Sequence, residues 1–513
     1  MSLRLGIDFG TTHTVVAAVD RGNYPIVSFH DDGGATTEWY PSLVAYKDGE
    51  WRFGMSAAAV SHKIEWSVCR SFKRFLADCE PDFKLQVGDG EISIIELLSR
   101  YLSALKSDLV SRSNLDVEKT EVFEVMISVP ANANNNQRFL TAEGFRLAGF
   151  DVLGAINEPT AAGVEYVHRF GVKGARSRKH YLLVFDLGGG TFDVSVIGIG
   201  MHQYETLATE GIMQLGGDDF DQLLFSLAIQ KSDFKGDLTQ AQKVRLLQEC
   251  REKKESLHPN TRKISIDLEQ AIPGAGDVNV AVADFYQVCG PLVDQTIEVV
   301  DRALASAAKH VGIDVEEIAS LYIVGGGSHF PLVNRKLREK FKHLVKRSSY
   351  PHGAAAVGLA IASDKDYKVE LKEQFTRDFG VWRENSAGKE IVLDRLFPKG
   401  TQLPAIGEEP IIVTRSYAPT HNIGYFRYFE CGRLNDSGKP ADDLSVLKEI
   451  RFPFDHALQG EKNLAGIKIG RFDQPATYTV DETYHCTDSG RVQLTIRDTS
   501  NGYEQRYLLV GNN

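Results

Sequence analysis

Two matched segments constrain the fold of this chain more than any other feature. Residues 5–12 (LGIDFGTT) read as an apolar strand that ends in Asp8 and a Gly/Thr turn, and a second apolar strand follows. The same pattern returns in residues 183–191 (LVFDLGGGT), with Asp186 in the place of Asp8. Two strand–turn–strand hairpins of one design predict two lobes of a duplicated plan that face each other.

The turns of these hairpins indicate phosphate binding, because glycine can adopt positive φ and bring backbone N–H groups close to a phosphate. A carboxylate beside such a turn would repel a bare polyphosphate, but it becomes favourable when Mg²⁺ and its waters lie between them. Paired aspartates at paired turns therefore predict a Mg-nucleotide site. Its candidate residues are Asp8, Gly10, Thr11, Thr12, Asp186, Gly188, Gly189, Gly190, Thr191 and Asp193.

A third glycine run, Gly325, Gly326 and Gly327, follows an apolar strand and leads through Pro331 into a helix. Its backbone could support the sugar or base of a nucleotide. The chain contains no GxxxxGK[ST], and no GxGxxG opens a helix after a strand. The nucleotide site is therefore of neither the P-loop nor the Rossmann type.

Strand-like and helix-like stretches alternate up to Ser363, which predicts α/β layers with parallel strands and crossover helices. Residues 364–378 are rich in charge and predict a linker, and short β-rich runs from Phe379 onward predict an all-β sandwich. The expected domains are residues 1–363, a linker of residues 364–378, and residues 379–513. Helices are expected at residues 92–107, 137–148, 218–231, 239–257, 282–307 and 331–344.

Composition excludes several classes of protein. A net charge of −11 without a long acidic block makes nucleic acid and anionic membranes unexpected partners. Six cysteines without a CxxC pair predict reduced thiols in a cytoplasmic protein. Asp8 interrupts any signal-peptide core, and the longest apolar run, residues 353–362, is shorter than the ~20 residues of a membrane span.

Five motifs, in order, resemble those of the 70-kilodalton heat-shock chaperones of DnaK type. They are residues 6–12, 129–131, 156–162, 185–195 and 215–221. The resemblance covers roughly residues 1–363 and implies an actin-like ATPase domain of two lobes with Mg-ATP at the base of the cleft. Residues 379–513 resemble the peptide-binding β-sandwich of that family only weakly.

The resemblance implies a role for each matched residue. Asp8, Asp186 and Asp193 would hold the water shell of Mg²⁺, and Thr11 and Thr191 would contact the terminal phosphate. Lys73 would lie beside the γ-phosphoryl group, and Glu158 would orient the attacking water. The implied catalytic set is Lys73, Glu158, Asp186, Thr191 and Asp193. The implied nucleotide contacts further include His13, Gly216, Gly217, Asp218, Arg251, Lys254, His258 and His329, beside the three glycine turns.

Four residues depart from the family on the adenine side. Arg251 stands where the family usually has an acid, and His258 stands where it has a serine. His329 replaces an arginine that stacks on the base, and His352 replaces an acid near the ribose and base. We therefore expect ATP and ADP to bind, with lower affinity than the family would suggest.

Coupling between the domains is expected to be weak. Residues 368–373 lack the leucine run of the family linker, although an extended Val369 and Leu371 could still share one face of an edge strand. The expected partners are peptide or protein clients and a nucleotide-exchange factor. Gly154 replaces the arginine beside the J-domain contact, and this argues against ordinary J-domain stimulation. Few residues follow the last β-like stretch, residues 503–510, so no helical lid is expected.

The sequence thus predicts a chaperone-like ATPase that hydrolyses Mg-ATP slowly to control peptide binding by a C-terminal β-domain. Two alternatives stay open. One is a small-molecule kinase of the actin-like superfamily, in which a hydroxyl group replaces water as the acceptor. The other is a nucleotide-regulated scaffold or filament protein of that superfamily. ATP consumption without an added acceptor would distinguish an ATPase from the kinase. Sedimentation with and without ATP would reveal a filament.

Overall fold

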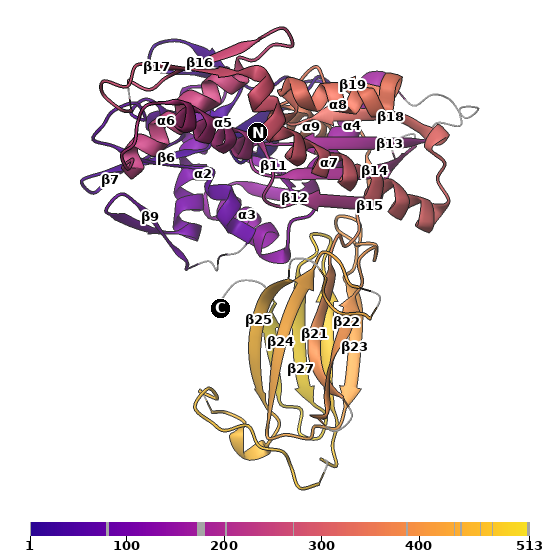
Figure 1. The fold of residues 1–513 in the computed structure, drawn as a ribbon. Helices are drawn as coiled ribbons and strands as arrows, with labels where there is room; N and C mark the ends of the chain where they lie inside the picture. The colour runs from indigo at the N-terminus through magenta and orange to yellow at the C-terminus, as the bar shows by residue number, and fades with distance from the viewer. Residues whose placement is uncertain are drawn as a thin grey trace. The chain divides into compact units, whose positions relative to one another are not determined.

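The computed structural model describes residues 2–509 except 78, 80–81, 119, 172–179, 201–202, 270, 386–387, 436, 442–443, 462 and 475 (Figure 1). The chain forms two compact units. The first comprises Met1–Leu76, Asp82–Asn132 and Thr141–Leu371, and the second comprises Ala77–Pro81, Ala133–Leu140 and Lys372–Asn513. The C-terminal boundary of the first unit falls inside the segment predicted as a linker.

The first sheet of the first unit has the strand order β12-β11-β1-β2-β5. Strands β1 (Ser2–Phe9) and β2 (His13–Ala18) form an antiparallel hairpin, and β11 (Val122–Val129) runs parallel to β1. Strands β5 (Tyr40–Pro41) and β12 (Asp151–Asn157) form the two edges. The turn between β1 and β2 therefore lies at the end of a strand that is paired on both sides.

The second sheet repeats this plan in the order β19-β18-β13-β14-β15-β20. Strands β13 (Tyr181–Leu187) and β14 (Phe192–Ile199) form an antiparallel hairpin, and β18 (Ile318–Val324) runs parallel to β13. Strand β15 (Gln203–Ile212) extends the hairpin, and β19 (Val345–Arg347) pairs with β18. The mixed α/β class expected from the alternating pattern is confirmed.

Helices cover both faces of the second sheet because its strands are apolar on both faces. In β13, Leu183 and Phe185 share one buried cluster with α7 (Val282–Val311), whereas Leu182 and Val184 share another with α4 (Glu158–Phe170). A continuous apolar run is the pattern of a strand buried on both sides. The remaining helices are α1 (Gly54–Ala58), α2 (Ile94–Ser111), α3 (Asn135–Leu147), α5 (Gly217–Lys231), α6 (Gln240–Glu255), α8 (Pro331–Phe341) and α9 (Ala354–Ser363).

Helix α9 is the apolar run that is too short for a membrane span. Nearly all of it is buried, and its packing is close: a Cβ on Gly358 would lie 1.7 Å from the carbonyl oxygen of Ala161 in α4. A Cβ on Gly6 of β1 would likewise lie 2.2 Å from the carbonyl oxygen of Ala356. These two glycines allow α9 to lie directly against α4 and β1. Within the described residues, no helix has the length and apolar character needed to cross a membrane.

The end of the first unit contains a short strand, β20 (Glu370–Lys372), at the edge of the second sheet beside β15. The half-buried side chains of Tyr367, Val369 and Leu371 pack against the buried cluster that includes Tyr204 of β15. The side-chain amide of Gln203 donates a hydrogen bond of 2.8 Å to Glu370. The extended conformation that Val369 and Leu371 permit is therefore the one that the structure adopts.

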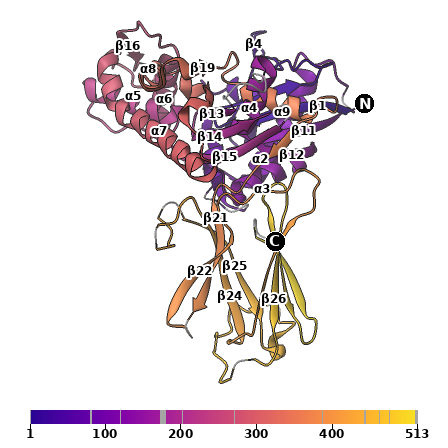
Figure 2. The same cartoon turned by 90° about the vertical axis from the view of Figure 1, so that its right-hand side faces the viewer.

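The second unit contains two four-stranded antiparallel sheets, ordered β22-β21-β24-β25 and β23-β26-β27-β28 (Figure 2). Alternate residues of both sheets, among them Phe379, Tyr428, Phe452, Tyr484 and Leu494, fill one core. The strands are β21 (Asp378–Asn385), β22 (Glu390–Phe397), β23 (Ile411–Tyr417), β24 (Ile423–Cys431), β25 (Leu444–Pro453), β26 (Val480–Cys486), β27 (Val492–Asp498) and β28 (Glu504–Leu508).

The first unit also contains short strands that form small sheets of two or three strands. They are β3 (Phe29–His30), β4 (Thr36–Thr37), β6 (Leu43–Lys47), β7 (Glu50–Phe53), β8 (Ser67–Arg70), β9 (Lys84–Val87), β10 (Gly90–Ser93), β16 (Lys263–Asp267) and β17 (Asp277–Ala281). The loop between β4 and β5 carries Trp39, which reaches the functional site described next.

Candidate functional site

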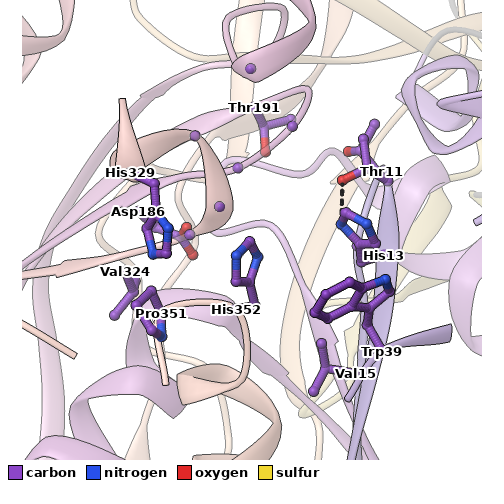
Figure 3. A pocket seen from close by; sticks show the side chains of 18 of the residues that line it. Thr11, His13, Val15, Trp39, Asp186, Thr191, Val324, His329, Pro351 and His352 are labelled. Carbon is purple, nitrogen blue, oxygen red and sulfur yellow. Dashed lines mark hydrogen bonds between the residues drawn. The ribbon is translucent and has the colours of Figure 1, made fainter. Parts of the chain in front are cut away.

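A cavity in the first unit lies where the three glycine turns converge (Figure 3). In the figure, Thr11, His13 and Trp39 stand on one side, Asp186 and His329 stand on the other, and His352 lies between them. The predicted site residues that line the cavity are Asp8, Gly10, Thr11, Thr12, His13, Lys73, Glu158, Asp186, Gly188, Gly189, Thr191, Gly217, Asp218, Arg251, Lys254, Gly325, Gly326, Gly327 and His329.

Glycine is required where the turns touch each other. A Cβ on Gly189 would lie 2.7 Å from the Cγ2 atom of Thr12, and a Cβ on Gly216 would lie 2.5 Å from the backbone of Gly189. Any larger residue at these positions would push the turns apart. The glycines therefore bring the hydroxyl of Thr12 and the backbone N–H groups of both hairpin turns to one place.

Two half-buried carboxylates, Asp8 and Asp186, line the cavity. Burial and the negative charge of Glu158 raise the pKa of Asp8 to about 7, although the hydroxyl of Ser128 donates a hydrogen bond of 2.6 Å to it. Burial, followed by the charges of Glu158 and Asp8, raises the pKa of Asp186 well above its ordinary value. The two acids thus lack sufficient positive charge, and a cation would stabilise their ionised forms.

A hydrated magnesium ion fits this pair. Mg²⁺ usually keeps several waters and binds through one or two carboxylates together with substrate phosphates. No group of three or more His, Cys, Asp or Glu side chains that could enclose a metal occurs among the residues that the structure describes. Asp8 and Asp186 are therefore suited to hold an ion that is shared with phosphate oxygens.

Asp193 of the predicted metal set is placed differently. It pairs with Asp186 in the register of β13 and β14, is almost completely buried, and does not line the cavity. Its Oδ1 atom accepts a hydrogen bond of 3.1 Å from the backbone N–H of Asn132. Its charge raises the pKa of Asp186 further. Asp193 therefore acts on the cavity through Asp186.

Lys73 and Glu158 form a buried pair beside these carboxylates. Lys73 lies in a 3-10 helix (Phe72–Ala77), and Glu158 is the first residue of α4. The Nζ atom of Lys73 donates a hydrogen bond of 2.8 Å to Glu158 and another to the carbonyl oxygen of Phe9. Their side chains are 4% and 11% exposed. A cation and a carboxylate are thus held together where the strands of both hairpins end.

Two other cations that line the cavity, Arg251 and Lys254, are paired with acids. Arg251 contacts Asp218 at 2.7 Å and Asp221 at 3.1 Å. Lys254 contacts Asp221 at 2.7 Å and donates a hydrogen bond of 2.8 Å to the carbonyl oxygen of Gly217. The acids Asp218 and Asp221 of α5 therefore engage both Arg251 and Lys254, two of the predicted nucleotide contacts.

Three further predicted residues lie outside the lining of the cavity. Gly190 and Gly216 support the turns behind it, whereas His258 is exposed and its backbone N–H donates a hydrogen bond to Thr261. Conversely, the structure brings in residues that the motifs do not mark, namely Val15, Trp39, Glu255, Val324, Phe330, Pro351, His352 and Ala355. Among these, only His352 carried a signal in the sequence, as a departure from the family.

Comparisons with known proteins agree with this geometry. A family profile described as Hsp70 protein matches residues 4–365. A curated protein described as "Chaperone protein HscA homolog", from Colwellia psychrerythraea, is 30% identical over 423 residues. This alignment covers 78% of the present chain and 65% of the relative. The chain thus spans somewhat less than two thirds of the length of the curated relative that it matches.

Proposed function

The chain belongs to the Hsp70 family, and on that premise we propose that it is a chaperone-type ATPase. It binds Mg-ATP in the cavity of the first unit, hydrolyses it slowly, and thereby controls the binding of peptide or protein clients by the β-strand unit. The observation that carries the proposal is the convergence of Asp8, Lys73, Glu158 and Asp186 with three glycine turns in one cavity.

The residues present divide the work in a way that suits phosphoryl transfer, which depends on positioning and on charge neutralisation. Asp8 and Asp186 would hold Mg²⁺ through waters, and the ion when bound would neutralise charge on the phosphates. The hydroxyls of Thr11 and Thr191 and the N–H groups of the glycine turns would bind phosphate oxygens. Asp193 would keep the potential around Asp186 negative.

Lys73 and Glu158 would serve the reacting atoms. The ammonium group of Lys73 would stabilise the charge that spreads over the transferred phosphoryl group, and the carboxylate of Glu158 would orient a water molecule toward it. Without nucleotide, the two side chains satisfy each other at 2.8 Å. Binding of a phosphate would let Lys73 share its donors between Glu158 and the phosphate oxygens.

The client, the exchange factor and the cytoplasmic location belong to the same proposal. They rest on the family and on the chaperone description of the relative. Gly154 in place of the family arginine supports independence from an ordinary J-domain co-chaperone.

Hydrolysis of ATP by the full chain, with Mg²⁺ and no added acceptor, tests the proposal. Lys73→Ala should bind ATP nearly as tightly as the unaltered chain but lose single-turnover hydrolysis, because this lysine serves mainly the transition state. Asp186→Ala should in addition lose the dependence of ATP binding on Mg²⁺. Lys84→Ala, which removes an exposed lysine paired with Glu91, is the matched control. Hydrolysis that is no faster than in buffer, or that persists in Lys73→Ala, contradicts the proposal.

A further inference from the structure

Four side chains with aromatic rings, Trp39, His13, His329 and His352, line the cavity (Figure 3). Trp39 and His13 come from the side of the first sheet, and His329 and His352 come from the side of the second. We call these four residues the ring cluster. The ring centres of His13 and Trp39 are 5.2 Å apart, and those of His329 and His352 are 5.0 Å apart.

His352 connects the two pairs of rings. Its centre lies 6.0 Å from that of His13 and 6.1 Å from that of Trp39. Its ring also rests on the third glycine turn, since a Cβ on Gly326 would lie 2.7 Å from its Cε1 atom. The backbone surface that could support a sugar or base is therefore covered by an imidazole ring.

The ring cluster carries no fixed charge. Burial, followed by the neighbouring charge of His352, lowers the pKa of His13 to about 3, and burial also lowers the pKa of His352. Both rings are therefore neutral at pH 7. Neutral imidazole and indole rings offer flat faces to a planar ligand and weakly polar edges. This chemistry suits stacking more than the recognition of a charge.

Two cations that line the same cavity, Arg251 and Lys254, are already paired with acids. Arg251 contacts two aspartates, and Lys254 contacts Asp221 and a backbone carbonyl oxygen. Moving either cation toward a base would break its contact with the buried carboxylate of Asp221, which costs free energy. The ring cluster is therefore the better candidate for contacts to a planar group.

We propose that Trp39 and His352 form the base-binding surface of the nucleotide site, an inference that rests on the proposed ATPase function. The base packs against these rings by stacking, without a charged partner. The rings already lie within contact distance of each other, because aromatic pairs touch at centre separations of about 4.5–7 Å. His352 must therefore move off Gly326 or away from Trp39 when a base enters.

Stacking tolerates different bases because every base presents a flat π face. ATP and GTP should consequently bind within about tenfold of each other. Inorganic tripolyphosphate, which has no base, should bind through the glycine turns alone. The three compounds separate the contribution of the ring cluster from that of the phosphate site.

Calorimetry on the full chain with Mg²⁺ tests the inference. Trp39→Ala should weaken the binding of both ATP and GTP by about tenfold, since stacking of one base on an aromatic side chain contributes about 1–3 kcal/mol. The affinity for tripolyphosphate should stay the same. Trp39→Phe should keep most of the affinity, and His352→Ala should weaken ATP without affecting tripolyphosphate. Trp66→Ala, the same substitution on an indole outside the cavity lining, is the matched control.

A fluorescence measurement keeps the test decisive if Trp39→Ala fails to fold. ATP should quench the tryptophan emission of the unaltered chain, and this quenching should disappear in Trp39→Phe, which retains the other three tryptophans. Equal affinity of Trp39→Ala for ATP, quenching that persists in Trp39→Phe, or a several-hundredfold preference for one purine overturns the inference. If neither ATP nor tripolyphosphate binds the unaltered chain, the proposed ATPase function itself is wrong.

Discussion

At the scale of single residues, the pair of Lys73 and Glu158 is the most consequential contact of the site. Both side chains are nearly excluded from solvent. A buried ion pair adds little net stability, but removal of one partner leaves a charge that is both desolvated and unpaired. The pair that would serve catalysis therefore also affects the stability of the nucleotide-free protein.

Lys73→Ala should lower the free energy of unfolding by about 3 kcal/mol, because it leaves the carboxylate of Glu158 without its cation. The double variant Lys73→Met with Glu158→Gln should recover more than half of this loss, since neither remaining group is charged. Urea unfolding of the nucleotide-free chain measures both effects. Lys84→Ala, at an exposed pair, should leave the midpoint unchanged. Additive losses in the double variant would contradict the coupling of the two residues.

His13 makes the stability of the nucleotide-free protein dependent on pH. Its folded pKa of about 3 lies below the ordinary value of 6.5, chiefly through burial and then through the charges of His352, Arg251 and Arg70. The unfolded chain therefore takes up the proton first as the pH falls below 6.5. Stability is present above pH 6.5 and is lost as the pH falls toward 3, by about 1.4 kcal/mol per pH unit.

His13→Gln should remove this dependence because glutamine does not titrate. Between pH 7.5 and pH 5.0, the variant should lose about 2 kcal/mol less unfolding free energy than the unaltered chain. Urea unfolding at the two pH values gives the difference. An equal loss in both chains would mean that the His13 imidazole becomes protonated in the folded state.

The sequence predicts the phosphate end of the site better than the base end. Asp8, Thr11 and Asp186 lie in short motifs whose glycines fix the local backbone. The strand–turn–strand pattern therefore predicts that these three residues lie close together in one site. Trp39 lies in a loop without a motif and enters the cavity through tertiary packing alone. His258 illustrates the reverse, because the resemblance implies that it contacts the nucleotide, but it is exposed and does not line the cavity.

At the scale of elements, the prediction misses three helices, α1, α4 and α9. Helix α9 is buried on nearly all sides, so its sequence lacks the alternation of polar and apolar residues that marks a surface helix. Helices with one polar face, such as α2, were predicted within a few residues of their bounds. The sequence allows strand β20 only as one possibility, because three residues are too few to show the alternation of apolar and polar residues that identifies a strand.

Leu371→Asp should detach β20 from the second sheet, because a charge cannot replace a half-buried leucine against an apolar core without losing its hydration. We expect faster hydrogen exchange in residues 367–372 and along β15, while exchange in β13 stays unchanged. Lys368→Asp alters charge at an exposed neighbouring position and serves as the control. Exchange of β15 that is identical in all three chains would show that β20 does not protect it.

At the scale of the whole molecule, the two units differ in how well their site residues can be predicted from the sequence. The family profile ends at residue 365, close to residue 363, where the resemblance read from the sequence ends. The second unit holds its sheets together by one apolar core, and such cores accept many combinations of residues with similar volume. Its sequence therefore predicts strands from their alternation but does not identify the residues that would contact a client.

Communication between nucleotide and client is the property that depends on the whole chain. A ligand shifts an equilibrium only by its difference in affinity for the two states. If ATP favours the form in which β20 is paired with β15, the burial of Val369 and Leu371 limits the free energy that can couple nucleotide binding to client binding. Half-burial of two such side chains contributes roughly 1.5–3 kcal/mol in total.

We therefore expect ATP to change the affinity for a client peptide by less than about tenfold, or about 1.4 kcal/mol of coupling, since only part of this limit can differ between the nucleotide states. Fluorescence anisotropy of a labelled peptide on the full chain, with ATP and with ADP, measures the effect. Leu371→Asp should abolish what coupling there is, whereas Lys368→Asp should preserve it. A hundredfold effect that survives Leu371→Asp would place the coupling in contacts other than β20.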